Sequence, residues 1–103
     1  MPRNPISEYR LSPAAQGDLN RIWDYTAATW SIAQAEAYVR GISETLAMLV
    51  RHPEMARERK EIDPPVRLHR YRSHLIVYRI GADHLAVIRI VHMRQHWQAL
   101  FNE

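Results

Sequence analysis

The chain has 103 residues with no cysteine, 47% hydrophobic and 24% charged residues, and a formal net charge of +3. This length allows one domain with one hydrophobic core, and the composition excludes a disordered chain, a disulfide framework and a thiolate metal site. The charge is modest for a nucleic-acid-binding protein, and no apolar run is long enough to span a membrane.

The beginning of the chain predicts a flexible start and then a short strand. Residues 1–5 lack an apolar signal region, and we expect them to be flexible. Residues 6–11 alternate weakly between apolar and polar side chains, as a strand does. Together with the missing cysteines, this start predicts a cytoplasmic protein in which residues 1–103 form a single domain.

Two helices are predicted next. Ser12 can cap the first, and proline at position 13 tolerates the first helical turn. Apolar residues then recur at helical spacing as far as Trp30. Ser31 and Gln34 have the spacing of a capping box, which predicts the start of the second helix.

The second helix should end at residue 52, because Pro53 pushes the preceding residue out of the helical conformation. Since almost no residues separate the two helices, we expect an antiparallel helical hairpin. Residues 53–65 contain a run of charged residues and end in two prolines, which predicts an exposed connection.

Three β-rich runs follow, at residues 66–72, 74–80 and 84–93. Residues 81–83, Gly-Ala-Asp, predict a hairpin turn between the last two runs. The fold class is therefore α+β: an N-terminal strand, an antiparallel two-helix hairpin packed on a small antiparallel sheet, and a short C-terminal segment.

A three-residue turn predicts the register of this hairpin, with even-numbered residues opposite even-numbered ones. The even face, which we expect against the helices, carries Ile76, Tyr78, Ile80, Ala86, Ile88 and Ile90. We expect Ile76, Ile88 and Ile90 of this face to share one core with Leu19, Ile22, Ile42 and Leu46. The odd face should be an open, partly apolar and basic surface carrying Leu75, Val77, Leu85, Val87, Val91, Arg79 and Arg89.

The positive charge is concentrated in this β-rich part. Residues 66–97 contain six arginines and five histidines against one acid, Asp83, whereas residues 1–50 contain four arginines and five acids. Such a field favours a polyanion or an acidic partner. The alternative is that arginine is only the solubilising cation, since Lys60 is the one lysine of the chain.

Residues 92–97, His-Met-Arg-Gln-His-Trp, are the one cluster that could perform acid–base chemistry on RNA. The alternative is a strand end with solvated polar side chains and Trp97 closing the core. His92 and His96 have the spacing of two metal ligands on one helical turn, but no third ligand accompanies them, so we expect no metal site. No serine elbow and no glycine-rich loop is present, and we expect no cofactor. The helix tryptophans Trp23 and Trp30 fit a core or the floor of a partner groove better than a cofactor site.

An ordered series of motifs resembles the ParE branch of the RelE/ParE superfamily of bacterial toxins. The series runs over residues 9–97 and consists of Tyr9-Arg10-Leu11-Ser12-Pro13-Ala14-Ala15-Gln16, Asp18-Leu19, Ile22-Trp23-Asp24-Tyr25, Trp30, Gln34-Ala35-Glu36, Tyr38, His52-Pro53, Ser73-His74, Val77-Tyr78-Arg79, and Arg89-Ile90-Val91-His92 with Arg94. The resemblance implies the toxin of a type II toxin–antitoxin module that poisons DNA gyrase without catalysis and is neutralised by a ParD-like antitoxin.

The superfamily leaves a second function open, because RelE-like relatives cleave mRNA on the ribosome with basic residues and a C-terminal tyrosine or histidine–tyrosine pair. This chain has no tyrosine after Tyr78, and Trp97 occupies that neighbourhood. It also carries His69-Arg70-Tyr71-Arg72 where ParE proteins have a proline-valine-glycine run. We therefore expect a binding toxin and no catalytic residue, with the ribosome-dependent mRNA interferase as the alternative.

Two sets of residues are candidates for binding. For the target they are Arg79, Arg89, His92, Arg94 and Trp97. For the antitoxin they are Trp23, Trp30, Arg70, Arg72, Leu75 and Val77. An acidic, amphipathic antitoxin tail suits the basic sheet face, and neutralisation could be steric because the same face could engage gyrase or its DNA. We expect neither membrane association nor direct sequence-specific binding of nucleic acid.

Overall fold

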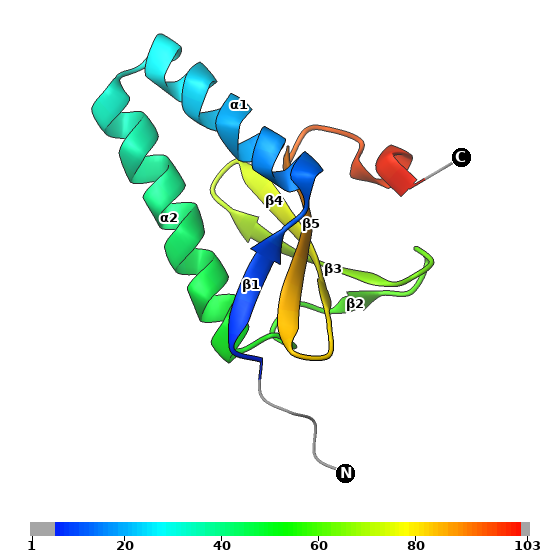
Figure 1. The fold of residues 1–103 in the computed structure, drawn as a ribbon. Coiled ribbons are helices and arrows are strands. Elements are labelled where there is room, and N and C mark those ends of the chain that lie inside the picture. Colours follow the sequence, from blue (N-terminus) through cyan, green and yellow to red (C-terminus); the bar gives the residue numbers. More distant parts are fainter. Residues whose placement is uncertain (1–5, 102–103) are drawn as a thin grey trace.

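The computed structural model describes residues 6–101, so the expected flexibility of residues 1–5 lies outside the described residues. Two helices pack on a five-stranded mixed sheet, and a short 3-10 helix follows the last strand (Figure 1). In chain order the elements are β1 (Glu8–Leu11), α1 (Pro13–Thr29), α2 (Ile32–Arg51), β2 (Glu58–Arg59), β3 (Val66–Tyr71), β4 (His74–Ile80), β5 (His84–His92) and η1 (Trp97–Phe101). The order of strands in the sheet is β1-β5-β4-β3-β2.

The helix boundaries are those that local capping predicts. The Ser12 hydroxyl accepts the N–H of Ala15 at 2.9 Å, and the Ser31 hydroxyl accepts the N–H of Gln34 at 3.0 Å. Helix α2 ends at Arg51, with His52 as its C-cap. The two helices lie side by side and run antiparallel, and their joined ends project beyond the sheet (Figure 1).

The sheet is larger than the predicted antiparallel one. Strand β1 pairs with β5 in parallel, and the residues predicted as an exposed connection contribute the two-residue strand β2, which pairs with β3. That connection is also not wholly exposed, because Ile62 is only 6% exposed. The predicted α+β class is confirmed: β3, β4 and β5 form the predicted antiparallel sheet, and β1 and β2 extend it to a five-stranded mixed sheet.

The register predicted for the β4–β5 hairpin was wrong: next to the turn even-numbered residues already lie opposite odd-numbered ones, and a bulge in β5 restores the pairing of even with even farther along. Ile80 pairs with Leu85 and Tyr78 with Val87, but beyond the bulge Ile76 pairs with Ile90. The skipped residue is Ile88. A bulge of this kind reverses which side chains face the helices within one strand. The helix-facing residues of β5 therefore change from odd to even numbers along its length.

Two hydrophobic clusters result. The helix-side cluster lies between the helices and the sheet and contains Ala15, Leu19, Ile22, Ile42, Leu46, Leu49, Ile76, Tyr78, Leu85, Val87 and Ile90. It includes every residue predicted for the shared core except Ile88. Leu85 and Val87, predicted for the open face, belong to it.

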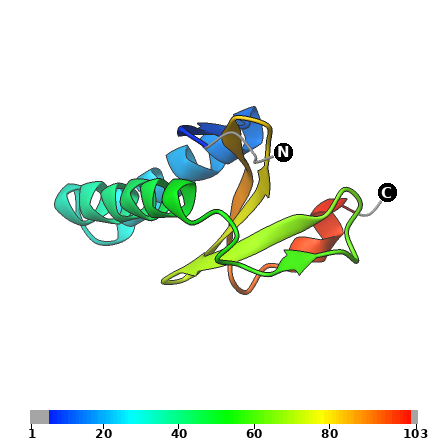
Figure 2. The same cartoon turned by 90° about the horizontal axis from the view of Figure 1, so that it is seen from below.

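The second cluster, here called the C-terminal cluster, covers the other face. It consists of Ile62, Val66, Val77, Val91 and Trp97, with Leu68, Leu75, Ile88, Leu100 and Phe101 packed against it. Figure 2 shows η1 on the opposite side of β5 from the two helices. The predicted open, partly apolar face was therefore wrong over this area, because the chain's own C-terminal segment buries it.

Candidate functional site

A row of four aromatic rings joins α2 to the ends of β3, β4 and β5. Tyr38 of α2 meets Tyr71 and His74 edge to face, with ring centroids 5.2 Å and 5.5 Å apart. His74 in turn meets His92 at 5.4 Å. Edge-to-face contacts of this kind stabilise a packing arrangement beyond the area that they bury. The row therefore fixes how the helical hairpin lies against the strand ends.

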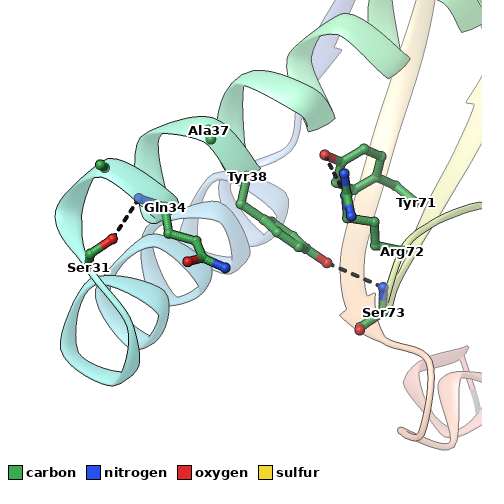
Figure 3. Close-up of a pocket in the computed structure, with 8 residues that line it drawn as sticks. Ser31, Gln34, Ala37, Tyr38, Tyr71, Arg72 and Ser73 are labelled. Atoms are coloured by element: carbon green, nitrogen blue, oxygen red, sulfur yellow. Dashed lines mark hydrogen bonds between the residues drawn. The ribbon is translucent and has the colours of Figure 1, made fainter.

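Hydrogen bonds fix the hydroxyl of Tyr38 at the centre of this row. It lies 2.8 Å from Nδ1 of His74 and accepts the N–H of Ser73 at 3.3 Å (Figure 3). Burial, together with the neighbouring His92, lowers the pKa of His74 below its ordinary value, although Asp18 acts in the opposite direction. A neutral His74 can accept the Tyr38 hydroxyl proton through Nδ1. Burial likewise raises the pKa of Tyr38, so the phenol keeps its proton.

An open groove of about 650 Å³ lies between the first half of α2 and the β3–β4 loop (Figure 3). Its lining residues are Ser31, Ala33, Gln34, Ala37, Tyr38, Tyr71, Arg72 and Ser73. Gly41 of α2 leaves room for the ring of Tyr71, because a Cβ there would overlap the Tyr71 hydroxyl. Tyr71 can therefore line the groove only because residue 41 of α2 is a glycine.

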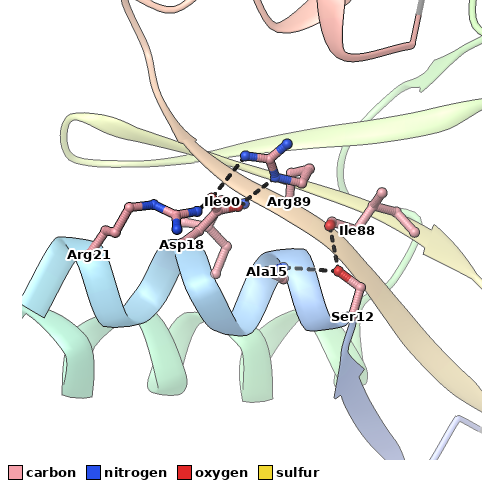
Figure 4. A network of polar contacts seen from close by, with 7 residues as sticks. All are labelled: Ser12, Ala15, Asp18, Arg21, Ile88, Arg89 and Ile90. Atoms are coloured by element: carbon pink, nitrogen blue, oxygen red, sulfur yellow. Dashed lines mark hydrogen bonds and ion pairs between the residues drawn. The ribbon is translucent and has the colours of Figure 1, made fainter.

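A second polar network, around Asp18, joins α1 to β5 (Figure 4). Asp18 is 5% exposed and accepts hydrogen bonds from Arg89 Nε at 2.8 Å, from Arg89 Nη2 at 2.9 Å and from the N–H of Ile90 at 2.8 Å. Arg21 adds a bond of 2.9 Å from the same helix. Burial alone would raise the pKa of Asp18, but the bonds from Arg89, Ile90 and Arg21 outweigh it, so the pKa is lowered.

This network lies next to the bulge in β5. We predicted Arg89 on the open odd face of the hairpin, away from the helices. The bulge instead brings Arg89 to α1, where the carboxylate of Asp18 pairs with it. At the bulge, the carbonyl of Ile88 also accepts the hydroxyl of Ser12 at 2.7 Å. A pairing between residues 71 positions apart is not visible in a local pattern.

The structure does not gather the five candidate target-binding residues on one surface. Arg89 is held by Asp18, and Arg79 donates to the carbonyls of Pro65 at 3.1 Å and Pro64 at 3.0 Å. Trp97 is 7% exposed, within the C-terminal cluster. His92 and Arg94 are exposed, and Nδ1 of His92 accepts the N–H of Arg94 at 3.1 Å. These last two are the candidates that a partner can reach directly.

The candidate antitoxin-binding residues also divide. Arg70 and Arg72 are exposed, Trp30 is 68% exposed at the end of α1, and Trp23 is half-buried. Leu75 is partly buried against the C-terminal cluster, and Val77 is fully buried within it. Val77 is therefore out of a partner's reach, because η1 and its neighbours cover that face.

Sequence reasoning missed Tyr38, Tyr71 and His74 as members of one site. They come from α2, β3 and β4, and no spacing along the chain relates them. Among residues 6–101, no group of three or more His, Cys, Asp or Glu side chains could hold a metal ion. The same residues contain no helix long and apolar enough to cross a membrane.

Comparison with known proteins identifies relatives over nearly the whole chain. The family described as the ParE toxin of the type II toxin–antitoxin system parDE matches residues 9–97. A protein of Mycobacterium tuberculosis H37Rv named Toxin ParE1 is 38% identical over 89 residues, which cover 85% of this chain and 91% of the relative. A Toxin ParE1 of Caulobacter vibrioides CB 15 is 33% identical over 94 residues, which cover 91% of this chain and 97% of the relative.

The fold has a solved counterpart as well. A chain of a structure titled "Chromosomal ParDE TA system from P. aeruginosa" superposes with a TM-score of 0.70 at 21% sequence identity, covering 85% of this chain and 96% of that chain. The match over residues 9–97 spans every strand and both α-helices except one residue of β1. This chain belongs to the ParE family of toxins of type II toxin–antitoxin systems.

Proposed function

We propose that this chain poisons DNA gyrase by binding it, without catalysing a reaction, and that a ParD-like antitoxin neutralises it in the cytoplasm. The family match over residues 9–97 carries the proposal. The related structure from P. aeruginosa is titled as a ParDE system, which supports an antitoxin as partner. ParE-type toxins are associated with gyrase, which supports the target.

The surroundings of the terminal residues support binding over catalysis. Of the cluster in residues 92–97, Trp97 packs inside the molecule, whereas His92 and Arg94 lie exposed at the strand end. Exposed arginine and histidine side chains suit a binding surface, and arginine commonly dominates binding energy. We therefore expect contacts with the target to be distributed over several residues.

One observation favours a second function, the ribosome-dependent mRNA interferase. The structure brings Tyr38 within 2.8 Å of His74, a tyrosine–histidine pair that the end of the sequence does not contain. A neutral histidine can act as a general base, and Arg72 and Arg94 supply positive charge at the same strand ends. The two functions therefore need a direct test.

The test measures inhibition of gyrase supercoiling beside mRNA cleavage in a translating extract, on the same preparations. We expect supercoiling to be inhibited, and to be restored by a cognate ParD-like antitoxin. Arg94→Ala and His92→Ala should weaken inhibition by graded amounts, with Arg57→Ala, in the exposed connection, as the matched control. Trp97→Ala is unsuitable, because its loss would disturb the C-terminal cluster.

The interferase makes the opposite prediction. Removing a general acid or base typically lowers an enzyme's rate by about 10²–10⁴-fold. Codon-positioned cleavage that vanishes in His92→Ala or His74→Ala, with supercoiling unaffected by the wild-type protein, would overturn the proposal.

A further inference from the structure

The β3–β4 loop holds an arginine in a backbone conformation that suits glycine. Tyr71 pairs with His74, so the loop consists of Arg72 and Ser73. Arg72 has a φ of 49° and is the only non-glycine residue with positive φ among residues 6–101. The first position of a two-residue hairpin loop requires positive φ and favours glycine, asparagine or aspartate. An arginine there is strained, and such strain tends to mark functional positions.

The side chain of Arg72 lies at the rim of the groove, on the ring of Tyr71. Its Nε donates to the Tyr71 hydroxyl at 3.3 Å, and its guanidinium carbon lies 5.7 Å from the ring centroid (Figure 3). Tyr71 is in turn seated against Gly41 of α2. These contacts hold a solvent-exposed guanidinium beside the groove.

The charge of the groove is one-sided. None of its eight lining residues is acidic, and Arg72 is its one charged residue. At the opposite wall lies Ser31, the N-cap of α2, where the helix dipole also favours negative charge. Between them, Ala37 and the rings of Tyr38 and Tyr71 offer apolar surface. The groove therefore complements a segment that carries both carboxylates and apolar side chains.

We propose that this groove binds an acidic, amphipathic segment of the antitoxin, and that Arg72 anchors the segment through a charge-assisted hydrogen bond to a carboxylate. The inference rests on the proposed neutralisation by an antitoxin. It moves the contact from the sheet face, which the C-terminal cluster covers, to the space between α2 and the β3–β4 loop. The strained backbone at Arg72 is then retained because a glycine would leave the carboxylate unpaired.

The first test combines affinity with stability. The probe is a full-length cognate ParD-like antitoxin, titrated into the full-length toxin by calorimetry, and melting temperatures are measured on the same variants. Arg72→Gly and Arg72→Asn should keep the wild-type melting temperature or exceed it, because both residues tolerate positive φ. Both should raise the dissociation constant about tenfold or more. Arg57→Gly removes the same charge from an exposed position after α2 and should leave the affinity unchanged.

The second test blocks the groove without touching a charge. Ala37→Trp fills it from the exposed surface of α2 and should weaken binding, whereas Ala14→Trp, at an exposed position in the first turn of α1, should not. A wild-type toxin that fails to bind the antitoxin overturns this inference together with the proposed function. If the wild-type toxin binds the antitoxin and the Arg72 variants bind it as tightly as Arg57→Gly does, only the proposal about the groove is overturned. A lowered melting temperature without loss of affinity would likewise assign Arg72 a purely structural role.

Discussion

At the scale of single residues, Asp18 and Gly41 shape how the helices meet the sheet. Asp18 is a nearly buried carboxylate that receives bonds from Arg89, Arg21 and the backbone of Ile90. Gly41 has no side chain, and the ring of Tyr71 occupies the space that a side chain there would fill. Each one joins elements that are distant in the sequence, so each can be tested by one substitution.

Asp18→Asn should lower the free energy of unfolding by about 3 kcal/mol at neutral pH, because it leaves the charge of Arg89 without its partner. Since the pKa of Asp18 is lowered in the folded state, its contribution is fully present above its unfolded pKa of about 3.9 and is lost as the pH falls through the folded pKa. The difference between wild type and variant in urea unfolding should therefore narrow in acid. Asp24→Asn, at an exposed position on the same helix, should change stability by less than about 0.5 kcal/mol. A difference that does not change with pH would contradict the ion pair.

Gly41→Ala should destabilise the protein by about 1–2 kcal/mol, because the new Cβ displaces Tyr71, although alanine is the better helix former. In a Tyr71→Ala background the same change should stabilise by about 1 kcal/mol, since only the helix propensity remains. Gly17→Ala is the matched control, because its Cβ would meet only Arg21 at 3.4 Å, and it should stabilise in both backgrounds. Urea unfolding of Gly41→Ala and Gly17→Ala, each in the wild-type and the Tyr71→Ala backgrounds, measures these changes in stability. Equal effects of Gly41→Ala in both backgrounds would show that Tyr71 does not occupy this space.

At the scale of elements, the bulge in β5 determines which of its side chains support the helices. Before it Leu85 and Val87 face the helices, and after it Ile90 does, while Ile88 turns toward the C-terminal cluster. The strand therefore serves two hydrophobic clusters.

Ile90→Ala should accordingly be the more damaging of two matched substitutions. Ile90 is fully buried, so we expect a loss of about 3–4 kcal/mol, whereas the partly buried Ile88→Ala should lose about 1–2 kcal/mol. Chemical denaturation of both variants decides between the registers. A loss for Ile88→Ala as large as that for Ile90→Ala would favour the even-numbered face that the sequence pattern predicts, since that face holds both residues.

The sequence predicted the elements that depend on neighbouring residues and missed those that depend on distant ones. Ser12, Ser31 and His52 cap or end helices through atoms within four positions, and their predicted roles are confirmed. The contacts of Arg89 beside the bulge involve Asp18, and the ring row involves Tyr38, and both residues lie far along the chain from their partners. The alternation of apolar residues along β5 could not predict which of them face the helices, because it changes at Ile88.

At the scale of the whole molecule, the positive charge should act mainly on association with the antitoxin. The net charge is +3, and the β-rich part carries most of the excess of arginine over acid. The association rate with the antitoxin should fall markedly as salt is added, while the dissociation rate should change less. Rapid-mixing kinetics at low and high salt measure both rates. A salt-independent association rate would remove this role of the arginines and leave apolar burial as the driving force.

The order of strands in the sheet has a consequence for synthesis of the protein. β1 is the first strand that a ribosome makes, yet it pairs with β5, the last. Until β5 leaves the ribosome, β1 has no strand to accept its hydrogen bonds, and Arg89 is not yet present to pair with Asp18. Contacts this distant in sequence form late, so translation that stops before residue 84 leaves the two helices without their sheet. The helices of a nascent chain can therefore pack on the complete sheet only after β5 has left the ribosome.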